Sequence, residues 1–122
     1  MLRARSGRLR VVLITLLVSH WPLPSVAGDY IVLGAGTRNC VAVLEAYEED
    51  SWQRVMDSVW VSGYLTAVNE HTTLATNVSA TMTAPEREHW LADYCQSNAG
   101  DTLHNAAGAL LHYLLKGTAN GR

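Results

Sequence analysis

The chain has 122 residues, with 9 Lys or Arg against 11 Asp or Glu, a formal net charge of −2 with neutral histidine. Four of the basic residues lie within the first ten positions, and no acidic residue precedes Asp29. Beyond position 27 the balance is therefore 5 − 11 = −6. Such an acidic segment excludes nucleic-acid binding by phosphate neutralisation and offers no basic patch to anionic lipid.

The first 27 residues have the three parts of a secretory signal peptide. A basic start is followed by the apolar run VVLITLLV at 11–18 and by small residues at Ser25 and Ala27. This order predicts export and cleavage between Ala27 and Gly28. The apolar run is shorter than the roughly 20 residues that a membrane span needs, so we expect no stable membrane insertion after cleavage. An uncleaved anchor is the alternative.

The predicted mature chain, 28–122, has the length of one small domain. Because it follows a predicted signal peptide, we expect it in the periplasm or outside the cell. Its two cysteines, Cys40 and Cys95, lie 95 − 40 = 55 positions apart. An even pair in an exported protein predicts a disulfide, and closing this loop could stabilise the fold by about 4 kcal/mol. Two buried free thiols are the alternative.

A glycine-rich turn, GAGTRNC at 34–40, precedes the first predicted helix. Gly34 and Gly36 match the start of the dinucleotide fingerprint G-x-G-x-x-G, but Asn39 stands at its third glycine position. No strand–helix–strand pattern surrounds the turn, so we expect no nucleotide cofactor. The simpler interpretation is a tight turn that places Cys40 at a helix start, with Thr37 or Asn39 as the cap.

Two helices are predicted next, over 40–49 and 51–72, the second capped by Ser51 or Asp50. Apolar residues recur in the second at steps of three and four, which indicates an amphipathic helix facing the core. Gly63 on that stripe predicts close approach of another backbone. We expect most of the tryptophans and tyrosines to be core residues. The stripe comprises Trp52, Val55, Met56, Val59, Trp60, Gly63, Tyr64, Ala67 and Val68.

A polar loop is predicted over 73–83, followed by two further helices. Thr83 and Glu86 form a T-x-x-E capping box at the start of the third helix. Asp101 is the predicted cap of the last helix, which we expect to end at Gly117. The predicted fold is therefore all-α, a small bundle of about four helices with one disulfide.

Four motifs in this order resemble a family of small, largely uncharacterised exported bacterial proteins: GAGTRNC, WVSGYLTAVN, WLADYCQSN and LHNAAGALLHYL. Ala99 departs from the family pattern, which usually has proline after Y-C-x-x-N. The layout is also similar, more distantly, to the HdeA/HdeB periplasmic acid-stress chaperones. In this resemblance, Cys40 and Cys95 of the present chain would correspond to the cysteine pair of those proteins. That resemblance implies a chaperone that loosens in acid and binds unfolding clients.

Few side chains form a pattern that indicates chemistry. Glu86 and His89 have the E-x-x-H spacing of di-iron bundles, with Asp93 one turn further on, but no second E-x-x-H exists. We therefore interpret them as an exposed polar face and expect no metal. His104 and His112 could respond to pH, although solvated or hydrogen-bonded histidines are the simpler interpretation. No serine stands in a G-x-S-x-G elbow, so we predict no catalytic residue and no enzyme.

The functional prediction is an exported, non-enzymatic protein that binds a protein partner or client, with a homodimer possible. One form is an acid-stress chaperone, in which protonating the capping carboxylates Asp50, Glu86 and Asp101 loosens helices. The alternative is an immunity or inhibitor protein that blocks another protein. A metal protein or enzyme using Glu86, His89 and Asp93 is the third interpretation.

Overall fold

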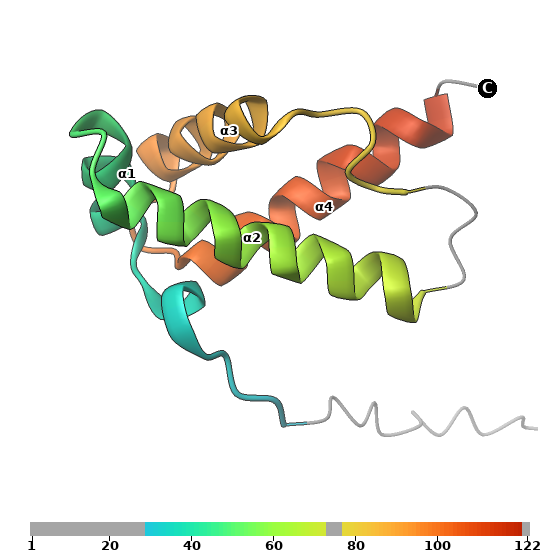
Figure 1. Cartoon of the computed structure of the whole chain (residues 1–122), viewed down its shortest axis with the longest axis horizontal. Helices are drawn as coiled ribbons and strands as arrows, with labels where there is room; N and C mark the ends of the chain where they lie inside the picture. Colours follow the sequence, from blue (N-terminus) through green and yellow to red (C-terminus); the bar gives the residue numbers. More distant parts are fainter. Residues whose placement is uncertain (1–28, 73–76, 121–122) are drawn as a thin grey trace, which may run out of the picture.

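The computed structural model describes residues 29–72 and 77–120, and the predicted signal peptide lies outside these ranges. The described part is all-helical and contains no strand. After the 3-10 turn η1, the order is α1 to α4, as Figure 1 shows. The predicted fold, an all-α bundle of four helices with one disulfide, is confirmed. The bounds are η1 Gly34–Thr37, α1 Cys40–Glu48, α2 Trp52–His71, α3 Ala84–Ser97 and α4 Leu103–Asn120.

Local capping explains why α1 and α3 begin where they do. The Asn39 side chain accepts a hydrogen bond from the Ala42 amide at 2.8 Å, which satisfies one of the free donors at the start of α1. Thr83 and Glu86 form the predicted capping box at the start of α3. Both helix starts were predicted from these short-range polar residues.

Three predicted helix ends differ from the structure. At α2, Ser51 occupies the cap position without a capping bond from its side chain. At α4, the Thr102 hydroxyl accepts from the Asn105 amide at 3.3 Å, so Thr102 and not Asp101 is the cap. The helix then continues through Gly117 to Asn120. An exposed glycine late in a helix costs only about 1 kcal/mol, which the preceding leucine stripe can offset.

The core lies where one face of α4 meets α1, α2 and α3. The other helices and the segment between α2 and α3 contribute Cys40, Val43, Val61, Leu65, Val78, Leu91 and Cys95. Val78 is fixed there because its amide donates to the Asn69 side chain at 2.9 Å. The α4 stripe was predicted correctly, and its buried members are Leu103, Ala106, Ala107, Leu110 and Leu114.

The predicted apolar stripe of α2 does not form one buried face. Trp52 is 73% exposed and Val59 is 61% exposed, so the expectation that they belong to the core is wrong. The buried side of α2 instead carries Asp57 beside Val61 and Leu65. An ideal Cβ at Gly63 would meet nothing within 4 Å, so no other backbone among the described residues approaches there. In Figure 1, α2 lies at the front of the view, with no described element covering it.

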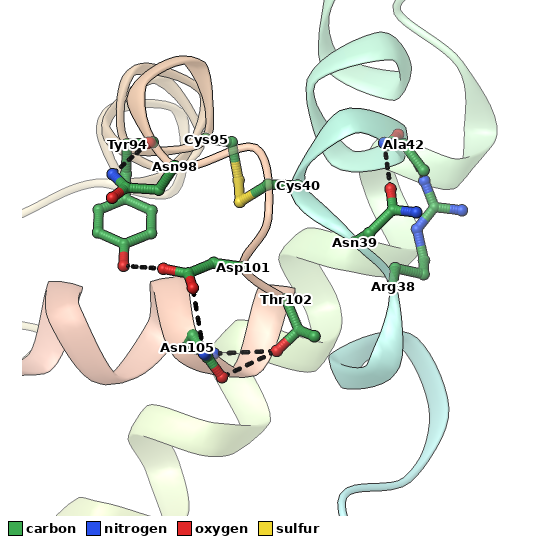
Figure 2. The surroundings of a disulfide bond; sticks show 10 residues. All are labelled: Arg38, Asn39, Cys40, Ala42, Tyr94, Cys95, Asn98, Asp101, Thr102 and Asn105. Atoms are coloured by element: carbon green, nitrogen blue, oxygen red, sulfur yellow. Dashed lines mark hydrogen bonds between the residues drawn. A yellow bond between two sulfur atoms is a disulfide. The ribbon is translucent and has the colours of Figure 1, made fainter.

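The disulfide is the covalent link of the fold. Cys40 opens α1, Cys95 lies in the last turn of α3, and their sulfur atoms are bonded. Beside them the Cys40 amide donates to the Asp101 carbonyl and the Leu103 amide to the Arg38 carbonyl, both at 2.8 Å. These contacts bring the start of α1, the end of α3 and the start of α4 together (Figure 2). We call this arrangement the clamp.

None of the helices in the described ranges is both long and apolar enough to cross a membrane.

Candidate functional site

An open groove of about 540 Å³ lies beside the clamp, between the segment that precedes η1 and the helices α2 and α4. We call it the aromatic groove. The segment 30–33 forms one wall, and two of its side chains, Ile31 and Leu33, are 85% and 73% exposed. The other wall comes from helical aromatic residues. The groove is lined by Tyr30, Ile31, Val32, Leu33, Trp60, Tyr64 and His104.

The helical wall of the groove is an aromatic cluster. Trp60 and Tyr64 are one turn apart on α2 and stack with ring centroids 5.9 Å apart. His104, in the first turn of α4, contacts both rings edge-on at 6.1 and 5.8 Å. The Tyr30 hydroxyl lies 3.1 Å from Nε2 of His104, which ties the preceding segment to α4. Residues separated by 74 positions therefore share one site.

The glycine turn holds Trp60. Its indole Nε1 donates to the Leu33 carbonyl at 2.8 Å, and the six-membered ring lies on the backbone of η1. Gly34 has a φ of +66°, a conformation that side chains rarely adopt. An ideal Cβ at Gly36 would lie 2.2 Å from Cζ2 of Trp60. The two glycines that match the start of a dinucleotide fingerprint thus have a packing role at the groove.

Replacing Gly36 with alanine should destabilise the protein by about 1–3 kcal/mol, because the indole or the η1 backbone has to move. Urea unfolding followed by circular dichroism measures the change. Gly100→Ala is the matched control, since an ideal Cβ there meets nothing within 4 Å. Equal effects of the two substitutions would contradict the packing role of Gly36.

The groove is apolar and carries no carboxylate or Lys/Arg side chain among its lining residues. Burial, and secondarily the neighbouring Tyr30, raise the pKa of Tyr64, so its phenol stays protonated at neutral pH. The available polar groups are therefore hydroxyls and the imidazole of His104. This chemistry suits apolar and aromatic side chains and does not suit phosphate or another anion.

The structure does not assemble the E-x-x-H residues into a metal site. The Glu86 carboxylate accepts from the Thr83 amide at 2.6 Å and from its hydroxyl at 2.7 Å, and these bonds lower the pKa of Glu86. His89 lies 3.5 Å from Asp93 and 3.2 Å from the Tyr47 hydroxyl. Within 29–72 and 77–120, no three His, Cys, Asp or Glu side chains are grouped to hold a metal.

The two histidines of α4 have different surroundings. His104 lies in the aromatic groove, whereas His112 is exposed two turns later. Sequence reasoning named His104 as a candidate but did not place Tyr30 or Leu33 near it. It also missed the ion pair between Arg38 and Asp57, in which Nε lies 3.0 Å from Oδ1. The residues of each of these contacts are far apart along the chain, so no local sequence pattern indicates them.

No protein-family model, curated protein or solved structure matches this chain. The resemblances to exported bacterial proteins and to HdeA/HdeB therefore stay predictions. The aromatic groove and the exposed face of α2 are identified by their geometry alone.

Proposed function

We propose that this protein is an exported, non-enzymatic binding protein, and that the aromatic groove receives apolar side chains of a partner protein. One observation carries the proposal: an open groove walled by Trp60, Tyr64 and His104, with exposed apolar side chains at its rim. Tryptophan and tyrosine are enriched among the residues that dominate binding energy at protein interfaces. Exposed apolar side chains beside them are typical of interaction surfaces.

The groove favours binding over catalysis. Its imidazole, His104, is hydrogen-bonded to the Tyr30 hydroxyl, and no carboxylate, Cys, Ser, Thr or Lys side chain lies among the lining residues. The groove therefore has no carboxylate to orient the imidazole and no Ser or Cys for it to activate, which are the partners of a histidine in the common nucleophilic triads. The exposure of the rim favours a protein over a small molecule, which a site usually encloses on most sides. A disulfide in the fold fits a compartment outside the reducing cytosol.

The inhibitor or immunity form of this proposal has the stronger support. The groove is present in the folded protein and lies beside the clamp, so a partner can bind without unfolding. A preorganised surface of this kind binds with less loss of conformational entropy. The partner would be one protein with apolar side chains that enter between Tyr30 and Trp60.

The acid-chaperone form is the second candidate, and Glu86 supports it. Its pKa is lowered by the bonds from Thr83, so its contribution to stability is present at neutral pH and is lost as pH falls through the lowered value. Asp57 has the opposite effect, because burial raises its pKa and the folded state therefore gains stability as pH falls. Acidification would thus destabilise the start of α3 through Glu86, while protonation of Asp57 in α2 would stabilise the fold and partly offset that loss.

Substituting Leu33 with aspartate should weaken partner binding at least tenfold, because a charge on the groove rim would have to be desolvated. Leu33 is 73% exposed and contributes its carbonyl, not its side chain, to Trp60, so the fold should persist. A photo-crosslinking amino acid at position 31 in the producing cell measures binding. We expect one discrete adduct at neutral pH, lost with Leu33→Asp.

The matched control places the same amino acid at Glu45, which is exposed on α1 away from the groove. Adducts of equal yield at 31 and 45, or none at 31, would contradict the proposed function. A second arm mixes the purified protein with an aggregation-prone client at about pH 3 and pH 7 and follows light scattering. Suppression only in acid, without a discrete adduct at neutral pH, would replace the inhibitor form with the chaperone form.

A further inference from the structure

A small cavity of about 20 Å³ lies where the four helices meet. Each helix contributes to its lining, through residues such as Val43 of α1, Asp57 of α2, Leu91 of α3 and Leu103 of α4. The cavity shares no lining residue with the aromatic groove, so it is a separate feature of the fold. A water molecule needs a cavity of roughly 10–15 Å³. This cavity therefore has room for one water molecule and for no larger ligand.

Two polar side chains of α2 that line the cavity have buried atoms without a hydrogen-bond partner among the described residues. These atoms are both carboxylate oxygens of Asp57, whose side chain is 7% exposed, and Nε of Arg54. Gln53, one turn before Asp57, is close to the carboxylate but makes no aligned hydrogen bond with it. Buried polar groups almost always have a partner, either in the protein or in an ordered water molecule. The cavity is where such a partner can bind.

The remaining hydrogen-bonding capacity of Arg54 and Asp57 is complementary to water. Nη1 of Arg54 donates to the Glu88 carboxylate at 3.0 Å, and Nη2 lies 2.6 Å from the Asp50 carboxylate, so Nε–H is the donor that is left. The ionised carboxylate of Asp57 can only accept. The two residues are three positions apart on α2 and are therefore neighbours on the helix surface. One water molecule can accept from the first and donate to the second.

We propose that this cavity binds one water molecule, which accepts a hydrogen bond from Nε of Arg54 and donates one to the carboxylate of Asp57. Ser58 and Glu88 also line the cavity and offer further acceptors, which fits the roughly two to four partners that a buried water uses. The water joins the ion pair of Asp57 with Arg38 to that of Arg54 with Glu88. It therefore links α2 both to the turn before α1 and to α3.

Charge favours a neutral ligand over an ion at this site. In the ion pairs beside the cavity, two guanidinium groups face three carboxylates, so the charges nearly balance and each already has a partner at 2.6–3.0 Å. An added cation or anion would have to be desolvated without a free counter-charge. A water molecule needs only the donor and the acceptor that remain.

Cross-relaxation between water and methyl protons tests the proposal on the purified, oxidised mature chain. In nuclear Overhauser spectra we expect cross-peaks from the water resonance to the methyl groups of Val43 and Leu91, which line the cavity. The matched control is Leu110, a fully buried leucine of the same core that lies outside the cavity lining. Its methyl cross-peaks should be at least roughly fivefold weaker, because an apolar core holds no ordered water.

Two variants separate a bound water molecule from other causes of such cross-peaks. Tyr47→Phe/Ser58→Ala removes the hydroxyl protons of the lining, which exchange with solvent and can relay the same signal. The proposed donor and acceptor remain in this variant, so the cross-peaks should persist. Arg38→Met/Asp57→Val replaces the buried ion pair with apolar side chains, which a fold often tolerates, and removes the acceptor. The cross-peaks should then fall at least roughly fivefold. Cross-peaks that are absent from the wild type, lost in the hydroxyl variant or unchanged in the ion-pair variant would overturn the inference.

Discussion

Replacing Cys40 and Cys95 with alanine should lower the free energy of unfolding by about 4 kcal/mol, most of the stability of a small domain. The bond closes a loop across 55 positions of sequence and joins α1 to α3. In the chain-entropy model its loss frees the unfolded chain, while the folded contacts remain. Urea unfolding of oxidised and variant protein, followed by circular dichroism at neutral pH, measures the difference.

Reduced wild-type protein is the control for packing. Both cysteines are almost fully buried, so alanine also removes core volume, whereas reduction retains the sulfur atoms. We expect reduction to account for most of the loss and the alanine variant to be slightly less stable than the reduced protein. Identical unfolding midpoints before and after reduction would show that the disulfide contributes nothing to stability.

The clamp also connects the disulfide to the groove. Near the disulfide, the Tyr94 hydroxyl donates to Asp101 at 2.6 Å, and Asp101 accepts from the side chain of Asn105 in the first turn of α4 (Figure 2). His104 belongs to this first turn and supplies one wall of the groove. Loss of the disulfide should therefore reduce partner crosslinking at position 31 as well as stability, even under conditions where the helices remain folded.

Much of the helical framework could be predicted because its signals are local. Asn39 and the Thr83–Glu86 box start helices through bonds to residues three positions away. In α4 the leucine and alanine residues that recur at steps of three and four lie on one face of the helix. Their spacing therefore indicates which face of α4 is buried. The cysteine pair follows from number and compartment. Each of these inferences needs only a few neighbouring residues or a count.

The orientation of α2 could not be predicted in the same way. Two sets of positions at steps of three and four run along this helix, one through Trp52 and Val59 and the other through Asp57 and Val61. The first is richer in large apolar residues, so hydrophobic period favours it as the core face. The structure buries the second, with Val61 and Leu65 in the core and Asp57 paired with Arg38. An ion partner 19 positions away leaves no trace in the local pattern.

The aromatic groove was missed for a related reason. Tyr30 and His104 are 74 positions apart, and the role of Gly36 depends on an indole that lies 24 positions later. A pair of glycines in a sequence indicates only a tight turn or a close contact with the backbone. Tertiary packing decides which side chain makes that contact, which here is Trp60.

Substituting Arg38 with methionine should destabilise the protein by about 3 kcal/mol at neutral pH, because it leaves the Asp57 carboxylate buried without its counter-charge. Nε of Arg38 lies 3.0 Å from Oδ1 of Asp57, whose side chain is 7% exposed. Neither carboxylate oxygen has an aligned hydrogen bond among the described residues, so the pair is held by charge. Methionine retains most of the packing of the arginine stem.

The pH dependence identifies the cause of this loss. Burial raises the pKa of Asp57 above 3.8 and Arg38 partly lowers it, so removing Arg38 should raise it further. A raised folded-state pKa means that stability is greatest below 3.8 and is lost as pH rises through the folded value. The deficit of Arg38→Met relative to wild type should therefore shrink between neutral pH and about pH 4.

Adding Asp57→Asn tests the same ion pair from the other side. The double variant has no buried carboxylate, so it should recover much of the stability at neutral pH and lose the pH-dependent deficit. It should not recover the bond from Nη2 of Arg38 to the Ala42 carbonyl, at 2.7 Å, which contributes about 1 kcal/mol at every pH. A deficit of Arg38→Met that is constant from pH 4 to pH 8 would instead assign the whole loss to packing and to this bond.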